Sequence, residues 1–340
     1  VGGKLTVTGD LDLRGCRAGR LDVGEAEVSG DLRLDGILGE GMVRINGCRV
    51  AGGVRLWQGK FKDWMEMNQC RIAGKADLRS FHAAEGVILR DCHFASEFLR
   101  RGSTVSKKLE FADCHLAGLT DFSKAKLHDV VYLDGIIPGK DQSFAFENAL
   151  FNRLLIEPEK LKDRLASENH GHHREAMMEY GLLKQNYQNL NRYEDEDWAF
   201  YRFKVNQRKA RPISWFKPWT VVARFLDYWL LDVGCGYGAK PFRAVTTAAV
   251  LMAAFAAVYA LGIHQLDVPH TPWPAFPLEH PVNRALFGLM TSVSVFTAGF
   301  SGEHLRGAQG WVLIPLALEA LVGTLLWGLF IVSFSRKVIR

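Results

Sequence analysis

Residues 43–72 read VRINGCRVAGGVRLWQGKFKDWMEMNQCRI and repeat one short pattern three times. In the first copy Val43, Ile45, Cys48 and Val50 are apolar, and most residues between them are polar or glycine. Steps of two residues are typical of a β-strand, whereas no helix places apolar side chains at successive steps of 2, 3, 2 and 4. The stretch therefore predicts short strands joined by corners.

The pattern continues in both directions with a period of 11 residues. Four of the six cysteines lie 22 residues apart, and halving that step gives a series of small or apolar residues: Ala26, Ile37, Cys48, Gly59, Cys70, Phe81, Cys92, Ser103, Cys114, Ala125 and Ile136. Two such units make one coil of a β-solenoid, in which each coil pairs only with its neighbours. About six coils stacked at roughly 4.8 Å would form a rod of roughly 30 Å over residues 1–150.

The segment KADLR at 75–79 resembles the five-residue unit of the pentapeptide-repeat family. The resemblance implies a right-handed β-solenoid with four-sided coils. This chain has one extra residue in each 11, which predicts a bulge at one corner. Arg100 interrupts the apolar pattern and predicts a local irregularity.

The regularly spaced cysteines have two interpretations, a metal site or a column of core residues. Tetrahedral zinc needs thiolates that converge from CxxC-like spacings, and a column with 22-residue steps does not supply them. Core packing is favoured, because free cysteine is among the most buried residue types. Unpaired thiols also fit a reducing compartment.

Charge is unevenly distributed along the 340 residues. The formal net charge is +5 and the mean hydropathy is close to zero, but residues 244–263 and 311–334 carry almost no charge. The basic residues are scattered, so we expect no nucleic-acid partner. The opening segment VGGKLTVTGDLDL lacks the apolar core of a signal peptide, and we expect the N-terminal region to be cytosolic.

Residues 151–214 are expected to form a helical linker domain. Apolar residues recur there at helical spacing: Leu161, Leu165, Met177, Tyr180, Leu183, Tyr187, Leu190, Trp198, Tyr201 and Val205. The HGHH segment at 170–173 is either a loop before a helix or a metal site, although no carboxylate or cysteine completes a known zinc spacing. The acidic run EDED at 194–197 predicts a helix N-terminus.

Residues 230–238, LLDVGCGYG, resemble both a methyltransferase glycine loop and the GYG of a potassium-channel filter. Neither interpretation holds. An apolar span follows directly and leaves no room for the βαβ unit of a methyltransferase, and GYG precedes both spans and lacks a pore helix. We expect residues 215–242 to form an interfacial helix with aromatic anchors. Gly234, Gly236 and Gly238 would end that helix and turn the chain into the span.

The uncharged segment 244–263 and the segment 311–334, whose one charge is Glu319, are each long enough to cross a bilayer as a helix. Lys240 and Arg243 precede the first span, and basic residues follow the second. The positive-inside rule then predicts an integral protein of the inner or plasma membrane, with both termini cytoplasmic.

The segment between the two spans predicts a re-entrant pore helix. Asn283 could cap a helix over residues 284–296, whose 12 to 13 residues are too few to span. The segment TAGFSGE, residues 297–303, follows. Non-helical backbone at membrane depth is tolerated where protein covers it or where it lines water.

Span, pore helix, glycine-bearing loop and span together resemble the two-transmembrane pore domain of tetrameric, potassium-channel-like ion channels, here over residues 243–340. The family filter T-V-G-Y-G matches in order Thr297, Ala298, Gly299, Phe300 and Ser301. Because Ser301 stands where the family has its second filter glycine, the resemblance implies a cation pore without strict potassium selectivity. Gly323 stands where the family has its gating hinge.

Two acidic residues belong to this expected pore. Glu319 lies inside a span, where an ionisable group is costly, so it either binds an ion or braces the pore helix by hydrogen bonds. Glu303 is expected in the outer vestibule, where it either attracts cations or is simply solvated.

One chain with two spans cannot enclose a pore, so we expect a homo-oligomer, most simply a tetramer, that conducts inorganic ions. The cytosolic solenoid and helical linker would gate it, with a protein or small ligand as their partner. The rival interpretation is a membrane-tethered scaffold whose solenoid binds a protein. We expect no enzyme, catalytic residue, cofactor or metal site, because no nucleophile–base pair or metal constellation stands out.

Overall fold

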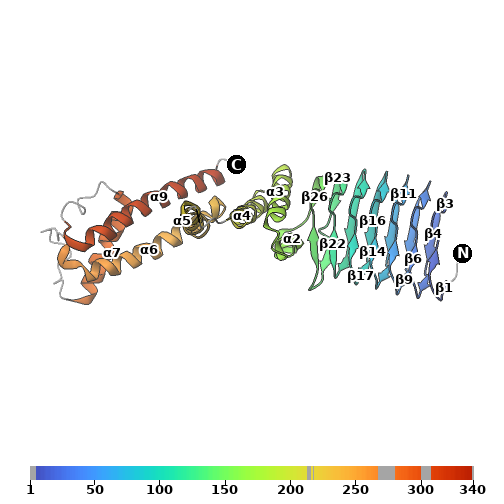
Figure 1. The fold of residues 1–340 in the computed structure, drawn as a ribbon, viewed down its shortest axis with the longest axis horizontal. Coiled ribbons are helices and arrows are strands. Elements are labelled where there is room, and N and C mark those ends of the chain that lie inside the picture. Colours follow the sequence, from blue (N-terminus) through green and yellow to red (C-terminus); the bar gives the residue numbers. More distant parts are fainter. Residues whose placement is uncertain (1–4, 213–215, 217, 267–279, 300–307, 339–340) are drawn as a thin grey trace. The chain divides into compact units, whose positions relative to one another are not determined.

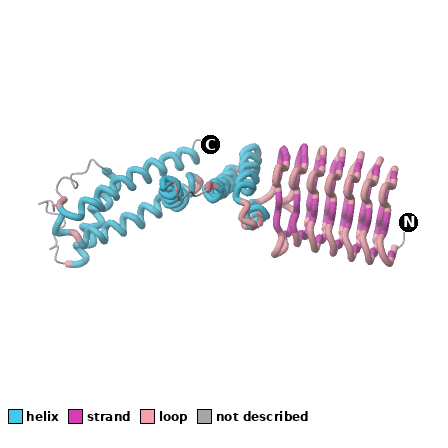
Figure 2. Tube along the Cα trace, in the orientation of Figure 1, coloured by secondary structure: helices cyan, strands magenta, loops and turns pink. Residues whose placement is uncertain are grey.

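The structure is a computed structural model that describes residues 5–212, 216, 218–266, 280–299 and 308–338. The chain divides into two compact units, Val1–Arg211 and Pro212–Arg340. The first unit holds a parallel β-solenoid followed by helices, and the second is built from helices in the part described (Figure 1, Figure 2).

The solenoid consists of short parallel strands, four to a coil, that pair from coil to coil and not along the chain (Figure 1). The first sheet contains β1 Thr6–Val7, β5 Glu27–Val28, β9 Arg49–Val50, β13 Arg71–Ile72, β17 His93–Phe94, β21 Cys114–Leu116 and β24 Ile136–Pro138. The second contains β2 Leu11–Asp12, β6 Leu32–Arg33, β10 Val54–Arg55, β14 Ala76–Asp77, β18 Phe98–Leu99, β22 Leu119–Asp121 and β25 Ser143–Ala145.

The third sheet joins two faces, because the long strand β23 belongs to both. Its strands are β3 Arg17–Ala18, β7 Leu38–Gly39, β11 Lys60–Phe61, β15 His82–Ala83, β19 Thr104–Val105, β23 Lys126–Tyr132, β20 Lys108–Ala112, β16 Gly86–Arg90, β12 Met65–Asn68, β8 Val43–Asn46, β4 Leu21–Gly24 and β26 Leu150–Leu155.

The 22-residue coil predicted from the cysteine spacing is confirmed. Lys60 pairs with His82 and Val43 with Met65, each one coil apart. Every member of the predicted inward series is buried. The first two sheets have seven strands each, so the solenoid has about seven coils, one more than expected.

The cysteine column is part of this core. Cys48, Cys70, Cys92 and Cys114 are buried, and each thiol donates a hydrogen bond to a carbonyl of the preceding coil, as Cys70 does to Ile45 O at 3.2 Å. The thiols therefore pack and bond within the stack, as the core-packing interpretation expected.

The extra residue in each 11 has a regular structural role. The residue directly before ten of the eleven inward positions has left-handed backbone: Glu25, Gly36, Gly47, Gln58, Gln69, Ser80, Asp91, Gly102, Asp113 and Lys124. Such a residue bends the strand and leaves the next side chain pointing into the core. A left-handed residue thus recurs at the same place in ten successive units, whereas the register shift of a β-bulge occurs between Leu127 and Val130, in the pairing of β23 with β26.

The irregularity predicted at Arg100 is wrong. The Arg100 amide donates to Asp121 O at 2.8 Å, as the equivalent Leu78 amide does to Leu99 O one coil earlier. The side chain points inward and is 0% exposed. Backbone pairing between coils is strong enough to hold the register, so the arginine is buried instead of displacing the strand.

Four helices complete the first unit: α1 Pro158–Leu161, α2 Ala166–Asn169, α3 His173–Asn189 and α4 Tyr193–Ala210. Glu194, Asp195 and Glu196 of the acidic run EDED lie in the first turn of α4, as predicted. Tyr180, Leu183 and Tyr187 of α3 belong to the same buried cluster as the last coils. The helices and the solenoid therefore share one hydrophobic core.

The second unit begins with α5 Pro218–Leu226, which continues into a π-helix, η1 Asp227–Val233. Its other elements are the short 3₁₀ helices η2 Gly236–Gly238, η3 Ile263–Gln265 and η5 Gly310–Val312 and the long helices α6 Pro241–Leu261, α7 Pro281–Ala298 and α9 Leu313–Val338. Two helices, Pro241–Leu261 and Gly310–Ser335, are long and apolar enough to cross a membrane by length and composition.

The helix between these two apolar helices differs from its prediction in length and start. α7 has 18 residues, equivalent to about 27 Å, and not 12 to 13. It begins after His280 with Pro281 at its first turn, so Asn283 lies inside the helix and is not its N-cap. Proline at the first turn starts the helix earlier because its fixed φ suits that position and its missing N–H is not needed there.

Candidate functional site

The candidate site lies where α6, α7 and α9 pack together. Two glycines allow the contact, because a Cβ on Gly288 would lie 2.3 Å from Ala256 O and one on Gly323 would lie 2.8 Å from Phe296 O. Small residues let helix backbones approach closely, which is typical of helix packing in membranes. α7 is thereby held against α6 at Gly288 and against α9 at Phe296.

Three of the five predicted filter residues are described. Thr297 and Ala298 form the last turn of α7, and Gly299 ends the helix with φ 57°. The Thr297 hydroxyl donates to Val293 O at 2.7 Å. Phe300 and Ser301, together with the predicted vestibule residue Glu303, lie outside the described residues.

The C-terminal end of α7 has the electrostatic character of any α-helix end. The last carbonyls of a helix have no partner within it, and they carry the negative end of the helix dipole. Gly299 supplies a backbone conformation that other residues rarely adopt. Its ideal Cβ would lie 3.0 Å from Thr324 Oγ1, so α9 also limits the side chain at this position.

An apolar cavity of about 300 Å³ lies between the three helices next to Thr297. Its walls are almost entirely hydrophobic and include Ala248, Met252, Phe296, Leu326 and Phe330. A cavity with this almost wholly apolar lining is not suited to holding an ion.

Glu319 of α9 is fully buried and joins all three helices. The Tyr259 hydroxyl of α6 lies 2.5 Å from Glu319 Oε2, and the Ser292 hydroxyl of α7 is hydrogen-bonded to Glu319 Oε1. Sequence reasoning singled out Glu319 but missed its two partners. Their signal was weak, because a lone tyrosine and a lone serine in apolar helices are common.

Gly323 lies within the uninterrupted helix α9 and carries the close contact with α7. Close packing is therefore its role in the conformation described. Its role as a gating hinge stays a prediction, since a hinge needs a second conformation.

The segment before α6 exposes large aromatic side chains. Trp219 is 80% exposed, and Phe225 and Trp229 are also exposed. Gly236, Tyr237 and Gly238 all have positive φ, so the chain turns there between η1 and α6. A helix precedes the glycines of LLDVGCGYG, where the methyltransferase loop would require a strand.

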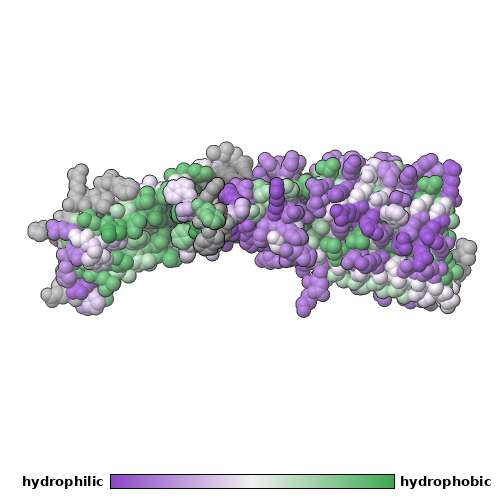
Figure 3. All heavy atoms as spheres, viewed as in Figure 1, coloured by the Kyte–Doolittle hydropathy of each residue, from purple (hydrophilic) through white to green (hydrophobic). Residues whose placement is uncertain are grey.

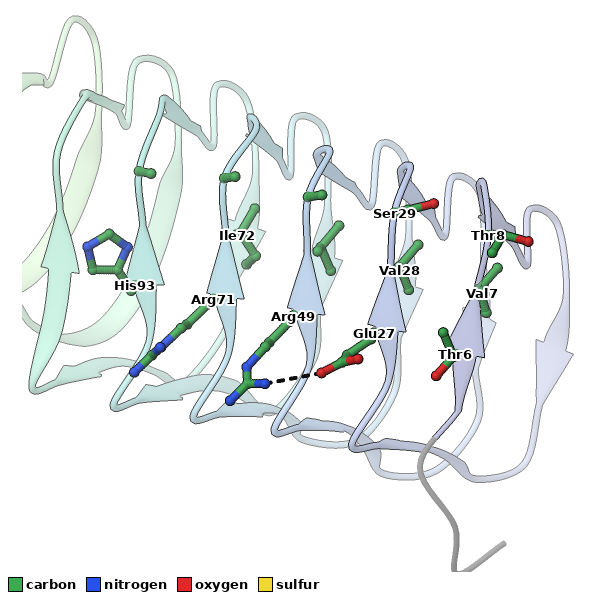
Figure 4. Close-up of a pocket in the computed structure, with 14 residues that line it drawn as sticks. Thr6, Val7, Thr8, Glu27, Val28, Ser29, Arg49, Arg71, Ile72 and His93 are labelled. Carbon is green, nitrogen blue, oxygen red and sulfur yellow. Dashed lines mark hydrogen bonds and ion pairs between the residues drawn. The ribbon is translucent and has the colours of Figure 1, made fainter.

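A second candidate surface lies on the first sheet of the solenoid, where a shallow groove of about 570 Å³ runs across the coils. Figure 4 shows Glu27, Arg49, Arg71 and His93 projecting in a row along one side of it. Arg49 pairs with Glu27 at 3.1 Å, whereas Arg71 forms no ion pair among the described residues. His115 continues the row, with its ring 5.6 Å from that of His93.

Neither a family model, a curated protein nor a solved structure matches this chain.

Proposed function

We propose that this chain is one subunit of an oligomeric membrane channel that conducts cations without strict potassium selectivity. The two apolar helices α6 and α9 would span the bilayer with both chain ends in the cytoplasm, and α7 would be the pore helix. The solenoid, a pentapeptide-repeat-like rod in this proposal, and the helices α1–α4 would bias opening from the cytosol.

The observation that carries the proposal is the position and end of α7. This helix packs closely on both apolar helices and ends at Gly299, the third residue of the segment TAGFSGE, whose φ is 57°. Arg284 lies in its first turn, so its apolar part is residues 285–298, about 21 Å long. This length is shorter than the bilayer core of about 30 Å and suits a re-entrant helix, which enters the membrane without crossing it.

The surfaces of α6 and α9 support a membrane location. Most residues of both helices are not buried in the single chain, and Val250, Leu261, Ile314 and Val332 are exposed. On the face shown in Figure 3 the part containing these helices is mostly hydrophobic, whereas the solenoid is mostly hydrophilic. Large exposed apolar surfaces mark contact with lipid or with other subunits.

The test is conduction by the purified full chain in planar bilayers, with potassium and sodium as the permeant ions. We expect currents that discriminate only weakly between the two ions. Gly299→Ala should reduce or abolish them, because alanine is strained at φ 57° and meets Thr324. Gly328→Ala is the matched control, since no atom lies within 4 Å of its added Cβ. Bilayers silent at all voltages would contradict the proposal.

The row of Arg49, Arg71, His93 and His115 favours the second candidate, a membrane-tethered scaffold that binds an acidic protein surface. A scaffold needs neither a glycine at position 299 nor ion conduction. It predicts silent bilayers, no effect of Gly299→Ala, and a partner lost on Arg71→Glu but kept on Lys60→Glu, a charge reversal on another sheet.

A further inference from the structure

Tyr259, Ser292 and Glu319 are each 0% exposed, and they meet from three different helices. The surrounding side chains in the same cluster are apolar and include Phe287, Val295 and Leu316. Within the described residues, the hydrogen-bond partners of these three polar groups are one another and the carbonyl of Met252.

The number of protons in this cluster depends on the charge of Glu319. The Ser292 hydroxyl lies 3.0 Å from Met252 O and is also hydrogen-bonded to Glu319 Oε1. A hydroxyl carries one proton and can donate it to only one of these oxygens. If Glu319 were ionised, Met252 O and Glu319 Oε1 could both only accept a hydrogen bond. The single proton of the Ser292 hydroxyl would then serve one of these oxygens, and the other contact would lack a donor.

A protonated Glu319 satisfies every contact. Tyr259 then donates to Oε2 at 2.5 Å, the carboxyl O–H on Oε1 donates to Ser292 Oγ, and Ser292 donates to Met252 O. The donors run in one direction, from α6 through α9 and α7 and back to the α6 backbone. Hydrogen bonds in such a chain strengthen one another.

The electrostatic surroundings lead to the same result. Within the described chain no lysine, arginine or histidine forms an ion pair with Glu319. A buried carboxylate without a cation pays its full desolvation cost, and a protonated carboxyl avoids it.

We propose that Glu319 is a neutral carboxylic acid that positions α7 between α6 and α9, with Tyr259 and Ser292 as its partners, and that it does not bind an ion. This goes beyond the proposed channel function and does not depend on it. The same cluster would position the helices of a chain that conducts nothing.

Infrared spectroscopy of the purified full chain at neutral pH tests the protonation directly. A protonated carboxyl has a C=O stretch above the amide I band, and a carboxylate has none there. We expect this band in the wild type and its loss in Glu319→Gln. Burial also raises the pKa of Glu179, which lies in the first unit, so Glu179→Gln is the control that identifies any second contribution. A band unchanged by Glu319→Gln would overturn the proposal.

Thermal unfolding of the same variants tests the positioning role. Glutamine can accept from Tyr259 and donate to Ser292, as a protonated glutamate does, so Glu319→Gln should keep the wild-type melting temperature. Glu319→Ala and Ser292→Ala should lower it. If Glu319→Gln were as unstable as Glu319→Ala, the carboxyl would be ionised in the folded protein and the proposal would be wrong. Neither measurement needs ion flux, so a failure to conduct would leave both results interpretable.

Discussion

At the scale of single residues, Arg100 places a guanidinium group in the solenoid core. None of its three nitrogens has a hydrogen-bond partner, and the group lies 5.6 Å from the centre of the Phe81 ring. The equivalent residues one coil before and after are Leu78 and Phe122, both buried. Arginine therefore occupies a position that suits an apolar side chain.

Burial lowers the pKa of Arg100 to about 9 from its ordinary 12.5. At neutral pH the guanidinium is charged in both the folded and the unfolded chain. The full free-energy cost of removing this charge from water therefore lowers the stability of the folded state. That cost is relieved only as pH rises from about 9 toward 12.5, where the folded state releases the proton first.

We predict that Arg100→Leu stabilises the solenoid by about 1–3 kcal/mol, because it removes an unpaired buried charge and restores the apolar column. Urea unfolding followed by far-ultraviolet circular dichroism measures the change. Arg101→Leu, at the exposed neighbouring position, should change stability little. A destabilised Arg100→Leu would mean that the guanidinium has a favourable partner.

At the scale of elements, α3 closes the last coil of the solenoid. Asn186 accepts a hydrogen bond from Leu154 N at 2.8 Å and donates one to Leu154 O at 2.8 Å, as a neighbouring strand would. Glu179 accepts from Phe146 N at 2.7 Å, and Tyr187 donates to Ile156 O at 3.1 Å. Side chains of one helix thus satisfy a sheet edge that would otherwise be open.

We predict that Asn186→Ala destabilises the first unit by about 2–4 kcal/mol, because two buried backbone groups of Leu154 lose their partners. Asn189→Ala on the exposed side of α3 is the control and should have little effect. Hydrogen exchange provides a local readout, and we expect faster exchange of the Leu154 amide in Asn186→Ala alone. Unchanged protection there would show that α3 does not cap the coil.

The contact of α9 with α7 at Gly323 leads to a second prediction at this scale. Gly323→Ala should destabilise the second unit by about 1–3 kcal/mol, because its Cβ would meet Phe296 O at 2.8 Å. Gly328→Ala, in the same helix with open space around it, should be neutral or slightly stabilising through its higher helix propensity. Tryptophan fluorescence during heating in detergent distinguishes the two. Equal melting temperatures for both variants would contradict the close contact.

At the scale of the whole molecule, the two compact units have separate cores. The larger buried cluster extends from Val23 to Ala199, and the second consists of residues between Tyr259 and Ala320. A region with its own core and closed sheet edge can fold alone. The apolar exposed surface is concentrated in the second unit, at residues such as Phe242 and Val332.

We predict that residues 1–211 expressed alone are soluble and show the circular dichroism of a β-rich protein with some helix, whereas the full chain sediments with membranes. Alkaline carbonate extraction distinguishes an integral protein from an adsorbed one. Release of the full chain by carbonate would contradict the two spans.

Much of the solenoid was predictable because its information is local and repeated. Each coil pairs only with its neighbours, so the 11-residue period sets the register and the inward positions together. The prediction failed at Arg100, where the pattern indicated a break but cooperative pairing of neighbouring coils held the strand in place. It also failed at the start of α7, where Pro281 extends the helix beyond its apolar stripe.

By itself the sequence determined the β-solenoid, the acidic start of α4 and the two long apolar helices, since each rests on a short-range pattern or on hydropathy. Only the tertiary structure decided which groups surround Glu319, because Ser292 and Tyr259 lie 27 and 60 residues away in the chain. The same holds for α3, whose Asn186 meets a strand edge 32 residues earlier. Hydrogen bonds between distant segments leave no period in the sequence, so their partners are known only once the helices are packed.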